Sequence, residues 1–254
     1  MVFVTGDCHG EYNRFSIKNF PEQKDMTRDD IVIVCGDFGL WHPGKEEDYW
    51  FDWIESKPFT LVFVDGNHEN FDRLYSDEFP IVDFHGGKAH RIRENLYHLM
   101  RGYVFDFDGK KFFAFGGASS HDNQDGILDR SEFDSEEEFT KTVYLWRKIG
   151  RMFRVNHISW WKEELPTFEE MERGGDILDE HGNRVDYIIT HCAPQDLVAA
   201  VFRLSESDRL TEFFKAVAET TAFDRWYFGH YHEDAALDYY GKYTVLYHYI
   251  ERVV

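Results

Sequence analysis

Short apolar runs alternate with glycine-containing polar loops along most of this 254-residue chain. The runs are rich in Val, Ile and aromatic residues, and glycine follows most of them closely, which predicts buried strands. Five runs lead directly into polar loops: residues 2–5, 31–35, 61–65, 185–189 and 226–228. Because sites in open α/β sheets collect at the carboxyl ends of strands, this pattern predicts an α/β fold with its functional residues along one edge.

Two further elements can be predicted from local pattern. The segments 103–107 and 110–115 flank Asp108-Gly109, which is a strong signal for a hairpin with a type I′ turn. Apolar residues recur at helical spacing over 209–220, just before the last of the five runs. Residues 86–99 alternate too little to be assigned.

The chain shows no internal repeat and no low-complexity linker, and it contains only 6 prolines. We therefore expect a single domain over residues 1–254. The segment at about 123–172 is charged and rich in aromatic residues, and it separates two predicted core elements. Long excursions of this kind serve as functional lids or are tolerated as decoration. We predict a cap or insertion here and leave both roles open.

The polar loops after the five runs supply eight oxygen and imidazole donors. They are Asp7, His9, Asp37, Asn67, His68, His191, His230 and His232. Mixed donors of this kind suit Mn, Fe or Zn better than Ca, which prefers oxygen ligands alone. Eight donors are too many for one tetrahedral ion, but they suit two ions about 3.5–4 Å apart, an arrangement that promotes displacement at phosphorus.

In chain order these loops read GDCHG, GDFG, GNHE, TH and GHYH. This succession, from Gly6 to His232, resembles the calcineurin-like metallophosphoesterases. The resemblance implies a four-layer α/β/β/α sandwich of two mixed sheets flanked by helices, with the metal site at the carboxyl ends of the strands. It also implies hydrolysis of a phosphomonoester or phosphodiester by a hydroxide that bridges two divalent transition-metal ions. Mn²⁺, Fe²⁺ or Fe³⁺ is the expected metal, and Zn²⁺ also fits the donors.

The resemblance gives each loop residue a role at the matching position. It assigns the first ion to Asp7, His9 and His232. It assigns the second ion to Asn67, His191 and His230. Asp37 would bridge both ions, and His68 would donate a proton to the leaving-group oxygen.

The sequence departs from the family's protein serine/threonine phosphatases, which extend the second motif to GDxxDRG. Leu40 and Trp41 occupy the positions of the second Asp and the Arg. An indole cannot replace a bidentate guanidinium, and the partner of His68 is left unassigned. We expect any substitute cation to come from the 123–172 segment, which carries Arg147, Arg151 and Arg154.

Two alternatives to a small-molecule phosphoesterase stay open. One is a serine/threonine phosphoprotein phosphatase whose arginine comes from elsewhere, such as Arg151 or Arg154. The other is a catalytically weak metal-binding module kept for protein interaction, although the full donor set with His68 argues against such decay. Among the other histidines, His121 alone follows a glycine-rich loop that could reach the site. Glu69 is expected to be a supporting carboxylate rather than a ligand.

The net charge of −20 restricts the partners of this chain. Binding to long duplex nucleic acid draws on Lys and Arg contacts with phosphates, so such a partner is disfavoured, as is an anionic membrane. A small phosphorylated substrate is compatible, because bound metal ions make the site itself positive. No apolar stretch approaches the roughly 18 residues of a membrane span. The three cysteines form no disulfide pattern and the first strand follows Met1 directly, so we expect a cytoplasmic protein.

Overall fold

Two large β-sheets lie face to face in the computed structural model, which describes residues 1–39, 43–204, 206–237 and 241–254. Leu40 and Trp41, which depart from the phosphatase motif, lie outside these described residues. The first sheet has the strand order β15-β1-β2-β3-β6-β5-β4, and the second has the order β13-β14-β12-β11-β8-β7. A separate pair, β9 and β10, forms a two-stranded sheet.

The strands are short. In the first sheet they are β1 (Val2–Thr5), β2 (Ile31–Val34), β3 (Thr60–Phe63), β4 (Ile81–Phe84), β5 (Gly87–Arg93), β6 (Leu96–Leu99) and β15 (Ile250–Arg252). In the second they are β7 (Tyr103–Phe107), β8 (Lys110–Phe115), β11 (Tyr187–Thr190), β12 (Arg225–Phe228), β13 (Ala235–Leu237) and β14 (Tyr243–Val245). The separate pair is β9 (Gly126–Leu128) and β10 (Phe153–Val155).

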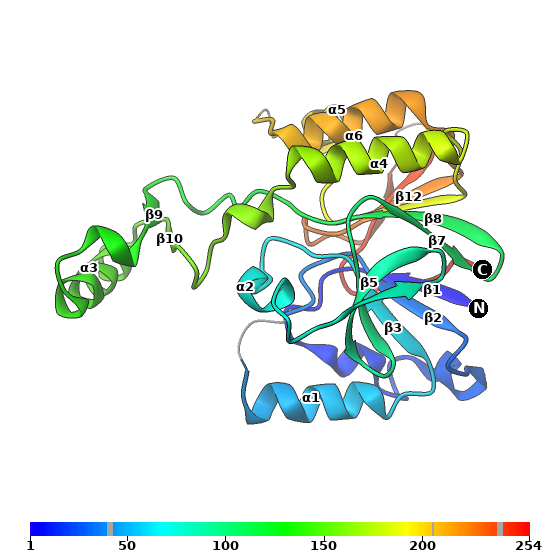
Figure 1. The fold of residues 1–254 in the computed structure, drawn as a ribbon, viewed down its shortest axis with the longest axis horizontal. Helices are drawn as coiled ribbons and strands as arrows, with labels where there is room; N and C mark the ends of the chain where they lie inside the picture. Colours follow the sequence, from blue (N-terminus) through cyan, green and yellow to red (C-terminus); the bar gives the residue numbers. More distant parts are fainter. Residues whose placement is uncertain (40–42, 205, 238–240) are drawn as a thin grey trace.

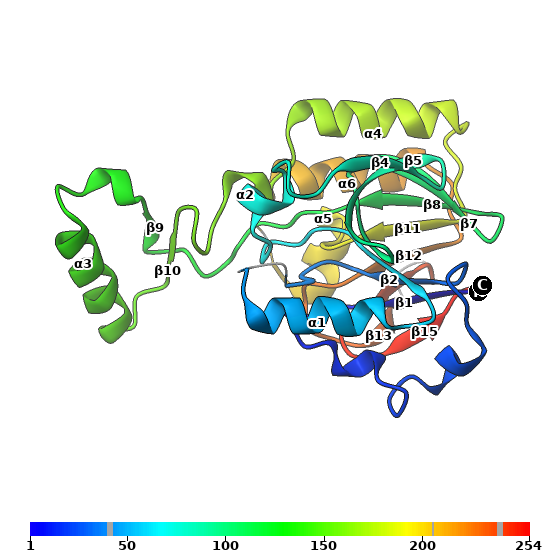
Figure 2. The same ribbon diagram turned by 60° about the horizontal axis from the view of Figure 1, so that its bottom comes forward.

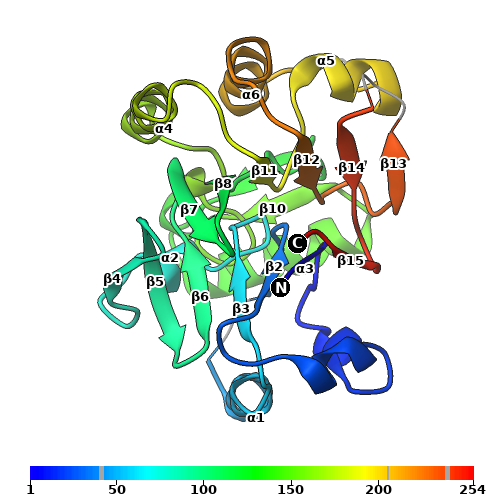
Figure 3. The same cartoon turned by 90° about the vertical axis from the view of Figure 1, so that its right-hand side faces the viewer.

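The helices are α1 (Lys45–Glu55), α2 (Phe71–Leu74), α3 (Glu136–Lys148), α4 (Phe168–Glu180), α5 (Gln195–Leu197) and α6 (Arg209–Thr220). Of these, α1, α4 and α6 cover the outer faces of the two large sheets. Short 3₁₀ turns lie at Tyr12–Phe15, Pro21–Asp25, Arg130–Glu132 and Lys162–Glu164, and a π turn at Val198–Phe202. Figure 3 shows α1 below the first sheet and α4 and α6 above the second. Within the described residues no helix is both long enough and apolar enough to cross a membrane.

The alternation of side chains along each strand builds the layers. Val2 and Val4 of β1 belong to the core between the two sheets, whereas Phe3 belongs to the core beneath α1. In β8, Ala114 faces the inter-sheet core and Phe115 packs with the residues of α6. A strand buried on both faces has no polar side, which explains why apolar residues in the runs do not alternate with polar ones. The four-layer α/β/β/α sandwich is confirmed.

The local predictions hold. Each of the five runs contains a strand, to within two residues at either end, and α6 has the predicted bounds. β7 and β8 pair antiparallel around Asp108 (φ 55°) and Gly109 (φ 74°), the two positive angles of a type I′ turn. The unassigned residues 86–99 form β5 and β6, which pair with a register shift between Arg91 and Arg93. This irregularity disrupts the regular alternation there.

The segment that carries β9, α3 and β10 forms an arm that projects from the sandwich (Figures 1 and 2). The arm carries α3 near its tip and the β9–β10 pair closer to the sheets. Its own small core contains Leu128, Phe139 and Val155. The division of the chain into one domain with a cap at about 123–172 stays a prediction. In the structure α4 begins at Phe168 and lies along the second sheet rather than in the arm.

Candidate metal centre

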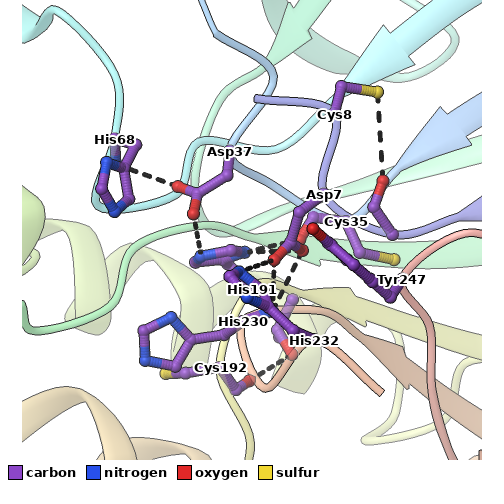
Figure 4. A network of polar contacts seen from close by, with 12 residues as sticks. Asp7, Cys8, Cys35, Asp37, His68, His191, Cys192, His230, His232 and Tyr247 are labelled. Atoms are coloured by element: carbon purple, nitrogen blue, oxygen red, sulfur yellow. Dashed lines mark hydrogen bonds and ion pairs between the residues drawn. The ribbon is translucent and has the colours of Figure 1, made fainter. Parts of the chain in front are cut away.

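The polar loops meet at the carboxyl ends of the parallel strands. Strands β1, β2 and β3 are parallel neighbours, as are β8, β11 and β12. Asp7 follows β1, Asp37 follows β2, and His191 follows β11 (Figure 4). The backbone N–H of His230, after β12, donates to both Asp7 carboxylate oxygens at 3.0 and 3.1 Å. The loops of the two sheets therefore form one site.

The first group of donors contains Asp7, His9 and His232, whose possible ligand atoms all lie within 4.8 Å of one another. The Nε2 atoms of His9 and His232 are 3.1 Å apart. His232 Nε2 lies 3.4 Å from Asp7 Oδ2, and His9 Nε2 lies 3.8 Å from the same oxygen. Two imidazole nitrogens and one carboxylate oxygen at these distances could provide three ligands of one metal ion.

A second group contains Asp7, Asp37 and His191, also within 4.8 Å. Asp37 Oδ2 lies 3.3 Å from His191 Nε2 and 3.8 Å from His9 Nε2. This oxygen is therefore placed between the two groups. The ring of His230 lies beside that of His191, with centroids 4.9 Å apart.

Asn67 provides a test of whether this site suits metal ions. Its Nδ2 donates to Ser120 Oγ at 3.2 Å, which fixes the orientation of the amide. Its Oδ1 is buried and has no hydrogen-bond partner among the described residues. A buried amide oxygen left unpaired costs about 1–3 kcal/mol. A cation would satisfy this oxygen, so the donor set fits a metal.

The imidazole tautomer of His191 also suits a metal ligand. Its Nδ1 lies 2.7 Å from the carbonyl oxygen of Cys35, to which it can only donate. In the neutral ring, Nε2 is then the acceptor nitrogen, and it faces Asp37. Histidines that bind a metal through one ring nitrogen usually donate the N–H of the other to a carbonyl or carboxylate oxygen, as His191 does here.

Four of the candidate donors have strained backbone. His9 (φ 49°), Asp37 (φ 46°), His230 (φ 69°) and His232 (φ 53°) lie in the left-handed region. Residues with a Cβ rarely adopt this conformation, and such strain clusters at functional sites. The packing around the site therefore holds these four residues in a backbone conformation that costs energy locally.

Two motif glycines make room for donors from other loops. A Cβ on Gly66 would stand 2.1 Å from Asp37 Oδ1, and one on Gly229 would stand 2.0 Å from Asp7 Oδ1. Both distances are far inside van der Waals contact. The glycines of GNHE and GHYH are thus required by the carboxylates of GDFG and GDCHG.

The buried charges of the site are strongly coupled. Burial by itself would raise the pKa of Asp37, but the nearby His191, His68 and His9 hold it well below its usual range. Burial opposes protonation of His191, yet Asp37 and Asp7 raise its pKa to about 10. Divalent ions would supply the positive charge that the carboxylates attract here, and would displace this proton.

His68 lies against both the donors and the arm. Its backbone N–H donates to Asp37 Oδ1 at 2.9 Å, and its ring stands edge-on to His9 with centroids 5.3 Å apart. Its Nε2 lies 3.3 Å from Nη2 of Arg154. Burial lowers the pKa of His68, Asp37 raises it, and Arg154 lowers it again, which leaves it below the ordinary value.

The structure separates the three arginines of the arm. Arg154 is 11% exposed, and it donates to Asp122 Oδ1 at 2.5 Å and to the carbonyl of Ser159 at 2.9 Å. Arg151 instead lies over the ring of Trp146, 4.3 Å from its centroid. Arg147 lies in the last turn of α3. Of the three, Arg154 is the one that contacts His68.

His121 does reach the site, because its Nε2 lies 3.1 Å from that of His230. The two oxygens of Glu69 accept backbone N–H groups of Phe38 (2.6 Å) and Gly39 (3.3 Å). Glu69 therefore supports the GDFG loop, as expected.

Several supporting residues had no role in the sequence analysis. Asp65 pairs with Arg101 at 2.5 Å and with His98 at 3.0 Å, fully buried behind the GNHE loop. Glu164, at the base of the arm, accepts the backbone N–H of Ser120 at 3.1 Å. For Asp65, the sequence offers one indication of a supporting role, because this acidic residue ends the apolar run 61–65. For Ser120 and Glu164 the sequence offers no such indication, since the two residues contact each other but are distant in sequence.

The sequence matches the family profile described as calcineurin-like phosphoesterase over residues 1–234. Fold, candidate site and this match place the chain in the class of metallophosphoesterase-type proteins. Within this class, the chain belongs to the calcineurin-like phosphoesterase family, whose members bind two divalent metal ions.

Among curated proteins, lariat debranching enzyme A of Xenopus laevis is 25% identical over 184 residues. The alignment covers 66% of this chain and 32% of that protein. The chain thus spans about a third of the length of this relative.

Proposed function

We propose that this chain hydrolyses a phosphomonoester or phosphodiester at a centre of two metal ions. The observation that carries the proposal is the position of Asp37 Oδ2, which lies 3.8 Å from His9 Nε2 and 3.3 Å from His191 Nε2. One carboxylate oxygen between two sets of imidazoles is the arrangement that lets a single residue bridge two cations.

The ligand assignment is the one that the family resemblance implies, and the two groups of donors support part of it. Asp7, His9 and His232 would hold the first ion. Asn67, His191 and His230 would hold the second ion, and Asp37 would bridge both. The bound ions supply an activated water and offset the charge that develops on the phosphoryl oxygens. Mn and Fe suit this mixture of imidazole and oxygen donors best, and Zn is the third candidate.

Two residues outside the ligand set act on the substrate. His68 lies at the rim of the centre, where it donates a proton to the departing oxygen. Arg154 extends from the arm to the same imidazole, 3.3 Å from Nε2. A phosphoryl oxygen entering between them would accept a charge-assisted hydrogen bond from the guanidinium. Arg154 thereby supplies the cation that the second motif lacks at Trp41.

The test combines metal content with turnover. We expect elemental analysis of protein purified without chelator to give two transition-metal ions per chain. The loaded protein should hydrolyse p-nitrophenyl phosphate or bis-p-nitrophenyl phosphate. A stoichiometry that stays near one under metal excess would refute the binuclear centre. Hydrolysis of neither ester with two metals bound would favour the binding-module alternative.

The natural substrate is a separate question. Selective turnover of a phosphoserine or phosphothreonine peptide over small esters would favour the phosphoprotein phosphatase alternative, with Arg154 as its arginine. The resemblance to a lariat debranching enzyme adds a lariat to the substrate panel. The charge of −20 weighs against long duplexes. A small phosphorylated substrate and a cytoplasmic location both remain predictions.

A further inference from the structure

A cavity of about 380 Å³ opens beside the candidate metal centre. Its lining includes His121 and His230 on the side of the centre, and Val198, Arg203, Leu204 and Tyr231 elsewhere. Ligand pockets in proteins occupy about 300–1,000 Å³, so this space can hold one ring-bearing group. We propose that it binds the ester substituent that stays on phosphorus, which makes the enzyme a phosphodiesterase. This inference rests on the proposed function.

The position of the cavity relative to His68 supports this assignment. His68 lies by His9 and Arg154, and none of these three residues lines the cavity. Figure 4 shows His68 beside Asp37, and His230 beyond His191. A leaving group protonated by His68 would therefore depart on one side of the centre. A second substituent on phosphorus needs a separate space, and the cavity at His230 provides it.

The loop after β8 divides these two spaces. His121 turns toward His230, with the two Nε2 atoms 3.1 Å apart, while the adjacent Asp122 pairs with Arg154 at 2.5 Å. His121 thus lines the cavity for the retained substituent, and the next residue, Asp122, holds Arg154 on the side where the leaving group departs. A phosphomonoester has a single carbon substituent, so it would fill only one of them.

The chemistry of the lining indicates what kind of group binds. Val198 and Leu204 provide apolar surface, and Tyr231 is stacked on Phe202 with ring centroids 3.8 Å apart. Arg203 has no hydrogen bond or ion pair with any other described residue, and its backbone is left-handed (φ 57°). The lining also includes the carboxylates of Glu206 and Asp208. Apolar surface bordered by a guanidinium and two carboxylates suits a ring with polar edges, such as a nucleoside.

Binding of two stable phosphinates tests the inference without turnover. Dimethylphosphinate and methyl(phenyl)phosphinate carry the same charge and differ by one ring. With metal-loaded protein, calorimetry should show the phenyl compound binding about ten-fold more tightly, since burial of a ring is favourable. Leu204→Trp fills the cavity from a side chain that is 40% exposed, and it should abolish most of this preference.

Two further variants make the test specific. Leu145→Trp makes the same change on α3, where Leu145 is 50% exposed, and should keep the preference. Arg203→Asn suits the left-handed backbone and removes the cation, so the phenyl compound should bind about two- to five-fold more weakly. In turnover, Leu204→Trp should lower kcat/KM for bis-p-nitrophenyl phosphate about ten-fold more than for p-nitrophenyl phosphate.

The outcomes distinguish this inference from the proposed function. If wild-type protein binds two metals and hydrolyses an ester, but Leu204→Trp keeps the ring preference, the cavity does not hold the substituent. Equal losses of kcat/KM in Leu204→Trp on both nitrophenyl esters would also overturn the assignment of the cavity. Failure of wild-type protein to bind two metals would instead overturn the proposed function.

Discussion

Replacement of Arg154 by alanine tests whether the arm takes part in substrate binding. The guanidinium is held by Asp122 at 2.5 Å and by the carbonyl of Ser159 at 2.9 Å, and it lies 3.3 Å from His68 Nε2. These contacts place it in advance, so little ordering is needed when a phosphoryl oxygen arrives. Arg154→Ala leaves Asp122 unpaired, but that carboxylate is 54% exposed and water can solvate it.

The expected loss can be estimated from one charge-assisted hydrogen bond. Such a bond is worth about 1.5–3 kcal/mol, which corresponds to about a 10- to 150-fold fall in kcat/KM. The fall should arise mainly from KM, because the guanidinium binds the substrate as well as the transition state. Metal content should not change, since Arg154 belongs to neither donor group.

The assay is steady-state kinetics of metal-loaded protein with a phosphate ester, together with elemental analysis. Arg151→Ala is the matched control, because Arg151 lies in the same arm but over the ring of Trp146. Arg154→Lys should recover part of the loss, since a lysine keeps the charge without the planar fork. Equal effects of Arg151→Ala and Arg154→Ala, or none from Arg154→Ala, would refute the clamp.

Three other changes test the site. Asp37→Asn should abolish turnover more completely than any other ligand change, because the two cations would repel with less charge between them; near-full rate with both metals bound would show that Asp37 is not the bridge. His68→Ala should spare metal content and slow an alkyl phosphate more than a nitrophenyl ester by up to about 10²–10⁴-fold; equal losses on both would remove His68 as proton donor. Burial raises the pKa of Glu164 from its ordinary 4.5 to about 8, so the folded protein holds a proton that the unfolded chain releases between these values. The stability from that proton is complete below 4.5 and is lost as the pH rises through 8, by at most about 1.4 kcal/mol per pH unit. Thermal unfolding of metal-free protein should therefore depend less on pH in Glu164→Gln than in wild type, and identical profiles would contradict the protonated state.

The sequence determined the strands that carry the motif loops. The strands β1, β2 and β11 are apolar at most positions because both faces are buried, between the sheets on one side and under helices on the other. The Asp108-Gly109 turn was equally local, since it depends on two positive φ angles that these residues accept. Burial and turn geometry act over a few residues, so a single sequence reveals them.

The meeting of the loops could also be anticipated in part. Parallel strands end at a common edge, so Asp7, Asp37 and Asn67 were expected together. The sequence could not show why the third and fifth motifs need their glycines. Gly66 is required by the carboxylate of Asp37, which comes from a different loop. That requirement exists only once the two loops are packed.

Only the tertiary structure decided which arm residues serve the site. Arg151 and Arg154 are equivalent by sequence, yet one covers Trp146 and the other contacts His68 across 86 positions of chain. Likewise, His121 faces His230 while Asp122, one residue later, pairs with Arg154. These partners are fixed by the direction in which the arm leaves the sheets, and that direction is set by long-range packing, which leaves no periodic signal in the sequence.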